Sequence, residues 1–307
     1  MYKNLGAYRN LPARLLIPVS GGRSSAYLLA HIIEANGGLK PQWVCCFQNT
    51  GLEDEATLRF LDRLDRHFCV KLVYLEFDPT INVQFKKTTN ALASREGQPF
   101  SALLTQTIAK RRDGTAGVRP LPNPVQRVCT TNLKVKTSHR YLRASLGWPT
   151  EYHTALGFRA DENKRVERRA KMDNQRSAPQ GGRGVYPMHT AGVSQDDVQS
   201  FWQAMPFDLE IDSARGNCDF CFMLSTWKIK ERMLLCALEQ QIKPVLVGPI
   251  PERVSRWIAW EERKSDRPGV FRRDRPTYRQ LWTQVCAGNM ASAVAEGRND
   301  QCGNCSD

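Results

Sequence analysis

The segment PVSGGRSSA, residues 18–26, has the composition of a loop that binds an anion. It lies between an apolar run and a stretch of helical spacing, so backbone N–H groups and hydroxyl groups can converge there on phosphate oxygens. Glycine has no Cβ and lets the backbone approach such a ligand closely. The Walker spacing G-x-x-x-x-G-K is absent, so the alternative is a plain strand-to-helix connection. The residues concerned are Ser20, Gly21, Gly22, Arg23, Ser24 and Ser25.

Five of the ten cysteines indicate sulfur or metal chemistry. Cys218 and Cys221 form a C-x-x-C pair, Cys302 and Cys305 form another, and Cys129 stands alone among basic and polar residues. All-thiolate ligation suits an iron–sulfur cluster or zinc. We favour a cluster on Cys129, Cys218 and Cys221 with Cys305 as its fourth ligand, while Cys302 or no protein ligand in that place stays open. The alternative is a zinc knuckle made by the two pairs.

The remaining cysteines lie in apolar or helical runs, where a small buried hydrophobic residue is the simplest interpretation. They are Cys45, Cys46, Cys69, Cys236 and Cys286.

The chain of 307 residues carries a formal net charge of +13, and the excess is local. Residues 159–183 hold eight basic and four acidic side chains, and residues 263–279 hold seven and two. Polyanions such as nucleic acid are the natural partners of such surfaces, although a solvated basic face is the ordinary alternative. No run approaches the roughly 20 apolar residues of a membrane helix, and we expect a cytoplasmic protein with no membrane partner.

Alternating strands and helices position the glycine-containing loop. Apolar runs predict strands at residues 14–19, 43–50 and 70–77, with helices at 26–35 and 53–68 between them. This order predicts an α/β fold with a doubly wound, mostly parallel sheet that helices cover on both faces.

Beyond the third strand the pattern weakens. Residues 78–128 are predicted as a polar loop region, in which the basic stretch 110–124 covers the site. The pattern then predicts a basic helix over 131–146, a fourth strand over 151–158 and a loop over 168–184. Two further helices are predicted over 194–205 and 227–240, and Ser194 is the predicted N-cap of the first of them. We assign residues 1–190 to a nucleotide-binding domain and residues 191–307 to a helical C-terminal region that carries the C-x-x-C pair.

Several segments together resemble one known superfamily. SGGRSS is similar to the S-G-G-x-D/S-S pyrophosphate loop of the adenine nucleotide alpha-hydrolases. FQNTGLEDEATLRFL resembles the F-x-N-T-G-x-E-x-x-x-T-x-x-F segment of phosphoadenylyl sulfate reductases and related ATP pyrophosphatases. RVCTTNLKVKTSHRYL is similar to their C-T-x-x-L-K-x-x-P segment, and LGFRADENKR to their G-x-R-x-D/E-E-S-x-x-R segment. YPMHTAGVSQDDVQSFW followed by GNCDFC is similar to their P-L-x-x-W-x-x-x-D-V and C-x-x-C succession.

The resemblance runs in order from Leu15 to Cys221, and it has three departures. Ser24 replaces the aspartate of ATP users, as is typical of the reductase branch. Thr137 stands where proline is frequent, and Cys129 is a single cysteine where cluster-bearing reductases have two.

The resemblance implies a HUP-like nucleotide domain and assigns the site residues. Catalytic roles fall to Ser20, Lys134, Arg159 and Cys302. Beyond the Ser20 to Ser25 loop, nucleotide contacts fall to Asn49, Thr50, Gly51, Glu53, Gly157, Arg159 and Arg165. For Glu53 and its neighbour Asp54, helix capping is the structural alternative.

The chain is most similar in these features to the ATP pyrophosphatases of DNA phosphorothioation systems. This implies a sulfurtransferase reaction with ATP and Mg²⁺, in which an oxygen of a nucleic acid is adenylated and then replaced by sulfur. DNA is favoured over tRNA as substrate, and a cysteine desulfurase would be the sulfur donor. A homodimer remains open.

Two alternatives belong to other classes. The tail DQCGNC resembles the E-C-G-L-H tail of sulfate reductases, which implies a reductase of adenylyl sulfate or its 3′-phosphorylated form with Cys302 as nucleophile. The other alternative is a nucleic-acid-binding module that keeps the loop without turnover.

Overall fold

The protein consists of two compact units that are discontinuous in sequence. A computed structural model describes residues 2–108, 117–118, 120–175, 182–211, 218–263 and 269–288. Within these ranges the first unit holds residues 2–99, 130–175 and 182–211, and the second holds the rest. Residues 100–108, 117–118 and 120–129 group with the C-terminal helices, and residues 191–211 group with the first unit.

The first unit contains a six-stranded sheet with the order β4-β3-β2-β1-β7-β8. All neighbouring strands pair in parallel except β3 and β4, which are antiparallel. This confirms an α/β fold with a mostly parallel sheet. The strands are β1 (Leu15–Pro18), β2 (Trp43–Asn49), β3 (Val73–Phe77), β4 (Phe85–Thr88), β7 (His153–Ala155) and β8 (Arg183–Val185).

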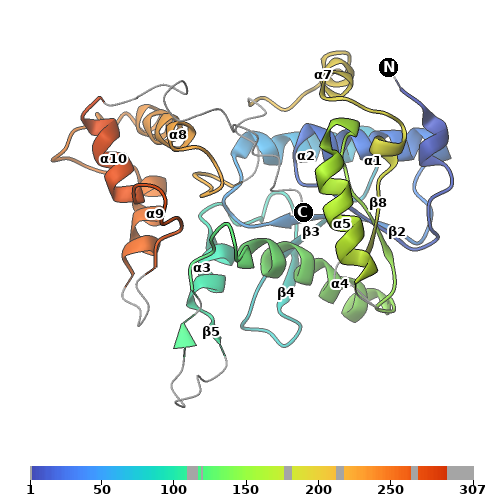
Figure 1. Cartoon of the computed structure of the whole chain (residues 1–307), viewed down its shortest axis with the longest axis horizontal. Helices are drawn as coiled ribbons and strands as arrows, with labels where there is room; N and C mark the ends of the chain where they lie inside the picture. Colours follow the sequence, from blue (N-terminus) through green and yellow to red (C-terminus); the bar gives the residue numbers. More distant parts are fainter. Residues whose placement is uncertain are drawn as a thin grey trace. The chain divides into compact units, whose positions relative to one another are not determined.

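Apolar side chains cover both faces of this sheet. Leu15 and Ile17 pack into one core and Leu16 into the other, because successive residues of a strand point to opposite faces. Figure 1 shows α1 (Arg23–Asn36) and α2 (Glu55–Phe68) on one side of the sheet and α4 (Thr137–Leu146) on the other. The first core also includes Phe201 and Trp202 from α7 (Gln195–Gln203), which therefore belongs to the first unit.

Local capping explains where these helices begin. Asp54 accepts a hydrogen bond from the N–H of Ala56 and is the N-cap of α2. Ser194 is the N-cap of α7 and forms a capping box with Asp197, as its sequence position predicts. The remaining helical segments of the first unit are η1 (Leu5–Tyr8), the π-helix η2 (Thr130–Lys136), η3 (Ala160–Glu162), α5 (Asn163–Asn174) and α6 (Pro187–Thr190).

Two regions predicted as loops contain regular structure. Helix α5 and strand β8 occupy much of residues 168–184, and only Asp173 of α5 is buried, so no apolar periodicity marks the helix. Within residues 78–128 lie β4, α3 (Gln98–Thr105) and the hairpin of β5 (Thr107–Ile108) and β6 (Gly117–Val118). Strand β4 escaped prediction because Lys86 and Lys87 are exposed. Most of the basic stretch 110–124 lies outside the described residues.

The second unit is helical and has an aromatic core. Its helices are α3, α8 (Thr226–Glu239), α9 (Glu252–Glu262) and α10 (Tyr278–Cys286). Rings of Phe100, Trp257, Phe271 and Tyr278 contact one another at centroid distances of 5.0 to 6.5 Å. In the part of the chain that the structure describes, no helix combines the length and apolar character needed to cross a lipid bilayer.

Candidate functional site

The glycine-containing loop lies at the point where the strand order of the sheet reverses direction. Strands β2 and β3 extend from one side of β1, whereas β7 and β8 extend from the other. In open α/β sheets, ligands bind outside the carboxyl ends of the strands at such a switch point. The loop of residues 19–22 follows β1 there, and the segment from Leu156 to Arg159 follows β7.

The first turn of α1 offers a row of unused backbone donors. Gly22 is the N-cap, and the first hydrogen bond of the helix runs from the N–H of Ala26 to the carbonyl of Gly22. Among the described residues, the N–H groups of residues 21–25 have no hydrogen-bond acceptor. Such N–H groups at a helix N-terminus carry partial positive charge and bind anions.

The glycines of the site serve different purposes. Gly21 has a φ of +80°, and a Cβ there would lie 2.2 Å from Cγ2 of Thr57, so this glycine permits α2 to pack under the loop. At Gly22 a Cβ would meet only Oγ of Ser20, at 3.6 Å. At Gly157 it would lie 3.2 Å from the carbonyl oxygen of Ser24. Gly21 is therefore needed for packing against α2, whereas a Cβ at Gly22 would meet no atom closer than 3.6 Å.

The serine hydroxyl groups divide between holding the loop and facing outward. Oγ of Ser25 accepts from the N–H of Ser20 at 3.1 Å and donates to the carbonyl of Gly22 at 3.0 Å. Oγ of Ser20 lies 3.1 Å from Oγ of Ser25. Since Ser25 is buried and fully engaged, it shapes the loop, whereas Ser24 is half-buried and contacts Arg159.

Arg159 places a permanent positive charge beside this turn. Its Nη1 donates to Oγ of Ser24 at 3.4 Å, and its Nε and Nη2 bind both oxygens of Asp161 at 3.0 and 2.9 Å. Burial alone would lower the pKa of Arg159, but Asp161 and Glu162 raise it above its ordinary value. Arg165 donates to Glu162 and lies over the ring of Phe158, with 4.3 Å between guanidinium carbon and centroid. Arg159 is thus at the site, and Arg165 supports it through Glu162.

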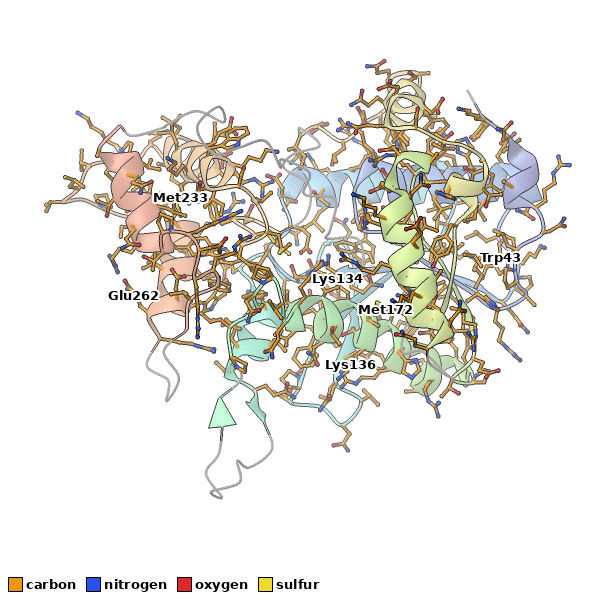
Figure 2. The ribbon with its side chains drawn as sticks, in the orientation of Figure 1. Trp43, Lys134, Lys136, Met172, Met233 and Glu262 are labelled. Carbon is orange, nitrogen blue, oxygen red and sulfur yellow. The ribbon has the colours of Figure 1, made fainter. Side chains whose placement is uncertain are left out.

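Glu53 lies near the end of β2, within electrostatic reach of Lys134. The carboxylate of Glu53 is buried and accepts from the N–H and hydroxyl of Thr50 at 3.0 and 2.8 Å. Burial raises the pKa of Glu53, while the positive charge of Lys134 and the Thr50 hydrogen bonds oppose that rise. Asp54, not Glu53, caps α2, so capping does not explain Glu53. Lys134, labelled in Figure 2, belongs to the π-helix η2, a geometry that is frequent at functional sites.

Three other predicted contact residues build the turn itself. The amide of Asn49 is fully buried and donates to Glu76 at 2.6 Å and to the carbonyl of Ser94 at 2.8 Å. Thr50 is buried against Glu53, and a Cβ on Gly51 would lie 2.9 Å from the backbone nitrogen of Gly97. A nucleotide could reach these side chains only if this network opened, so the structure gives them a supporting position.

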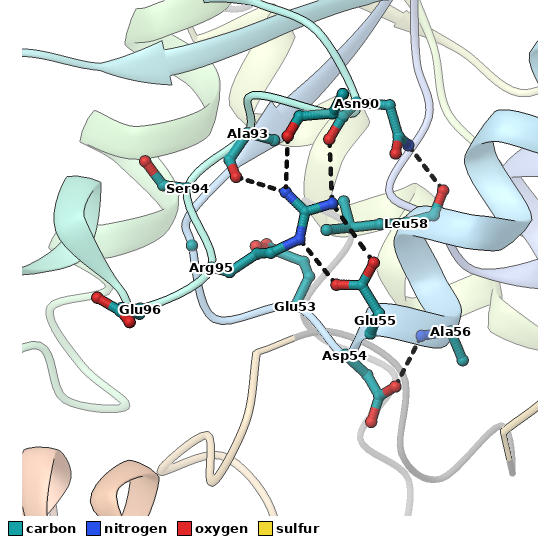
Figure 3. A network of polar contacts seen from close by, with 12 residues as sticks. Glu53, Asp54, Glu55, Ala56, Leu58, Asn90, Ala93, Ser94, Arg95 and Glu96 are labelled. Atoms are coloured by element: carbon teal, nitrogen blue, oxygen red, sulfur yellow. Dashed lines mark hydrogen bonds and ion pairs between the residues drawn. The ribbon is translucent and has the colours of Figure 1, made fainter.

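An ion pair fastens the neighbouring loop to α2. Figure 3 shows the guanidinium of Arg95 between both oxygens of Glu55 and the carbonyls of Asn90 and Ala93. Glu76, fully buried at the end of β3, accepts from the N–H and hydroxyl of Ser94 in the same loop. The loop that covers the end of β2 is thereby held in one conformation.

Arg23 points away from the glycine-containing loop. Its guanidinium binds both oxygens of Asp208 at 2.7 and 2.9 Å and the carbonyls of Leu209 and Ile211. A phosphate contact by Arg23 can therefore come only from its backbone N–H. Asp208 carries no sequence signal for its role, because it reaches the loop from a distant part of the chain. Thr57 occupies the threonine position of the segment FQNTGLEDEATLRFL, but nothing in that pattern places it against Gly21.

The described residues cover only part of the predicted cysteine cluster. Among them, no group of three His, Cys, Asp or Glu side chains is arranged to hold a metal. The cluster expected on Cys129, Cys218, Cys221 and Cys305 stays a prediction. Cys302 and Cys305 lie outside the described ranges. Cys45, Cys46 and Cys236 are buried as predicted, but Cys286 is half-buried and Cys69 is exposed at the C-cap of α2.

Comparison with known proteins gives one informative similarity. No protein-family model matches the chain. Over 231 residues the chain is 28% identical to the uncharacterized nin region protein ORF290 of Escherichia phage lambda. The aligned part covers 75% of this chain and 72% of the phage protein. The similarity assigns no activity.

Proposed function

We propose that the first unit is a HUP-like domain of the adenine nucleotide alpha-hydrolase type that binds the phosphates of ATP at residues 20–25. The observation that supports this most is the row of N–H groups from Gly21 to Ser25, which have no acceptor among the described residues and lie at the switch point of the sheet. Gly157 permits close packing beside that row, and Arg159 adds a full positive charge there.

The proposed reaction is ATP pyrophosphatase chemistry on a nucleic acid, with backbone phosphate of DNA as the favoured acceptor. An oxygen of the acceptor attacks the α-phosphorus of ATP, the bond to the β-phosphate oxygen breaks, and pyrophosphate leaves. Sulfide, supplied by a cysteine desulfurase with a thiol reductant, then forms a bond to the activated phosphorus and displaces AMP. The net charge of +13 suits a polyanionic substrate.

The residues of the site contribute position and charge. The loop N–H groups and Arg159 would hold phosphate oxygens, and Lys134 would stabilise charge that develops on the leaving group. Mg²⁺ would offset the charge of the pyrophosphate. Both oxygens of Glu53 accept hydrogen bonds from Thr50 in this arrangement. We therefore expect water and phosphate oxygens to provide most of the Mg²⁺ ligands.

An iron–sulfur cluster held by Cys129, Cys218, Cys221 and Cys305 stays a prediction, with zinc as the alternative, and no step of the reaction is assigned to it. Cys302 stays a candidate for sulfur transfer or for nucleophilic attack and lies outside the described residues.

Release of pyrophosphate from α-³²P-labelled ATP, in the presence of DNA and a sulfur donor, tests this proposal. We expect turnover by the wild-type protein, a loss of at least tenfold for Arg159→Gln, and little change for the control Arg9→Gln, which removes an exposed charge elsewhere. No pyrophosphate under any acceptor condition would refute the proposal.

Ser24 favours the reductase as the second candidate, because it stands where ATP users carry aspartate and contacts Arg159. Sulfite produced from phosphoadenylyl sulfate with thioredoxin or glutathione as the two-electron reductant, and abolished by Cys302→Ser, would replace the first proposal with this one. Nucleotide binding without any product would instead favour the nucleic-acid-binding module that keeps the loop without turnover.

A further inference from the structure

The outward face of α5 carries a row of three cations. Lys164, Arg168 and Lys171 are exposed, and their spacing of four and then three residues places them on one side of the helix. Figure 1 shows α5 along the front of the first unit, and Figure 2 labels Met172 near its end.

The other basic residues of α5 are used to hold the helix in place. Arg169 binds Asp173 at 2.9 Å and the carbonyl of Gly182 at 2.6 Å. Asp173 also accepts from the N–H of Gly184 in β8 at 2.7 Å, and Arg165 donates to Glu162. Polar contacts thus anchor the inner face, which leaves the outer cations without a role in folding.

The three outer cations have no ion-pair partner in the described part of the chain. One acidic side chain, Glu167, is exposed beside them, so the exposed face of the helix keeps a net charge of +2, from three cations and one anion. Unpaired cations aligned on a rigid element attract a linear polyanion more strongly than scattered surface charges do.

We propose that Lys164, Arg168 and Lys171 bind the sugar–phosphate backbone of a nucleic acid. Seven helical rises of about 1.5 Å span roughly 10 Å, and over that length of duplex axis one strand carries about three phosphate charges, at roughly 3.4 Å of axis per charge. Because α5 follows directly on Arg159 and Glu162, a strand on this row leads toward the nucleotide site. The inference rests on the proposed function for its substrate class and adds the surface that holds it.

The test compares two triple variants that remove the same charge. Lys164→Gln/Arg168→Gln/Lys171→Gln removes the row on α5. Arg9→Gln/Arg14→Gln/Lys71→Gln removes three exposed cations of the same unit. Arg14 and Lys71 lie at the amino ends of β1 and β3, whereas the candidate site lies at the carboxyl ends of the strands. Circular dichroism and the urea midpoint establish that both variants are folded.

Binding to a labelled 20-base-pair DNA is measured by fluorescence anisotropy across a salt series. Each phosphate contact contributes about 0.9 to the slope of log affinity against log salt, so we expect the α5 variant to lose about 2.7 of the slope and at least tenfold in affinity near 0.1 M salt. The control variant should lose less than about 1. Equal losses in the two variants, or an unchanged slope for the α5 variant, would overturn the inference.

ATP binding by the same proteins separates this inference from the proposed function. If wild-type protein binds and splits ATP but the α5 variant binds DNA like the control, the inference fails and the proposed function stands. If DNA binding depends on α5 while no protein binds ATP, the proposed function fails and the surface assignment stands.

Discussion

Substitution of Gly21 tests how the candidate phosphate loop is built. In Gly21→Ala the backbone stays at a φ of +80°, and the new Cβ would lie 2.2 Å from Cγ2 of Thr57. Carbon atoms in contact are normally about 3.5–4.0 Å apart, so either the loop or α2 must move.

Both the left-handed backbone and the close contact with Thr57 should lower the free energy of unfolding of Gly21→Ala, and each has its own magnitude. A left-handed backbone costs alanine about 1–2 kcal/mol. Overpacking of a well-filled core typically costs about 1–3 kcal/mol more. We therefore expect Gly21→Ala to lower the free energy of unfolding by roughly 2–5 kcal/mol, the sum of these two ranges. Gly22→Ala, with an ordinary φ of −93° and an open Cβ position, should change it by less than about 1 kcal/mol.

Urea denaturation of single and double variants measures both terms. Thr57→Ser removes the methyl group that the new Cβ meets, so the double variant Gly21→Ala/Thr57→Ser should recover the overpacking part, about 1–3 kcal/mol, and retain the backbone part. Gly22→Ala should unfold like the wild type yet bind ATP more weakly, since its Cβ would enter the space assigned to phosphate. Equal stability of the two alanine variants, or no coupling between positions 21 and 57, would refute this account of the loop.

Three further predictions concern the framework of the site. Burial lowers the pKa of His31 from 6.5 to about 4, so between these pH values the unfolded chain binds more protons than the folded chain. The free energy of unfolding should therefore fall by about 3 kcal/mol as the pH falls from 6.5 to about 4. His31→Phe should flatten this pH dependence in urea titrations. Glu76→Gln should cost about 2–3 kcal/mol at pH 7, because it replaces a buried charged acceptor; a change below about 0.5 kcal/mol would contradict the network. Arg23→Lys keeps the charge but loses the two-pronged contact with Asp208, and the urea midpoint should fall by the equivalent of about 1–2 kcal/mol, whereas an unchanged midpoint would argue against this anchor.

The central sheet was predictable because its strands are apolar and buried on both faces. Leu15, Leu16 and Ile17 are all buried, and such continuous runs are typical of parallel strands. The position of the glycine-containing loop between β1 and α1 followed from that pattern.

Polar elements were not predictable in the same way. Helix α5 is held by Arg169 and Asp173 rather than by apolar burial, and hydrophobic periodicity cannot reveal such a helix. Strand β4 has two exposed lysines, Lys86 and Lys87, and pairs only at the edge of the sheet.

The site was predictable only as a set of segments. Which side chains point at a ligand depends on partners far apart in sequence, such as Asp208 for Arg23 and Glu76 for Asn49. The left-handed conformation of Cys69 at the C-cap of α2 likewise exposes a thiol that its neighbours suggested would be buried.

The proposed ATP site depends most directly on the backbone N–H groups of residues 21–25. Nuclear magnetic resonance of ¹⁵N-labelled protein during titration with Mg·ATP observes these groups individually. We predict that the largest shifts occur at residues 21–25 and 157, with smaller changes at Arg9 and Lys71. Saturable binding whose shifts lie elsewhere and spare residues 21–25 would contradict the claim that this turn holds the phosphates.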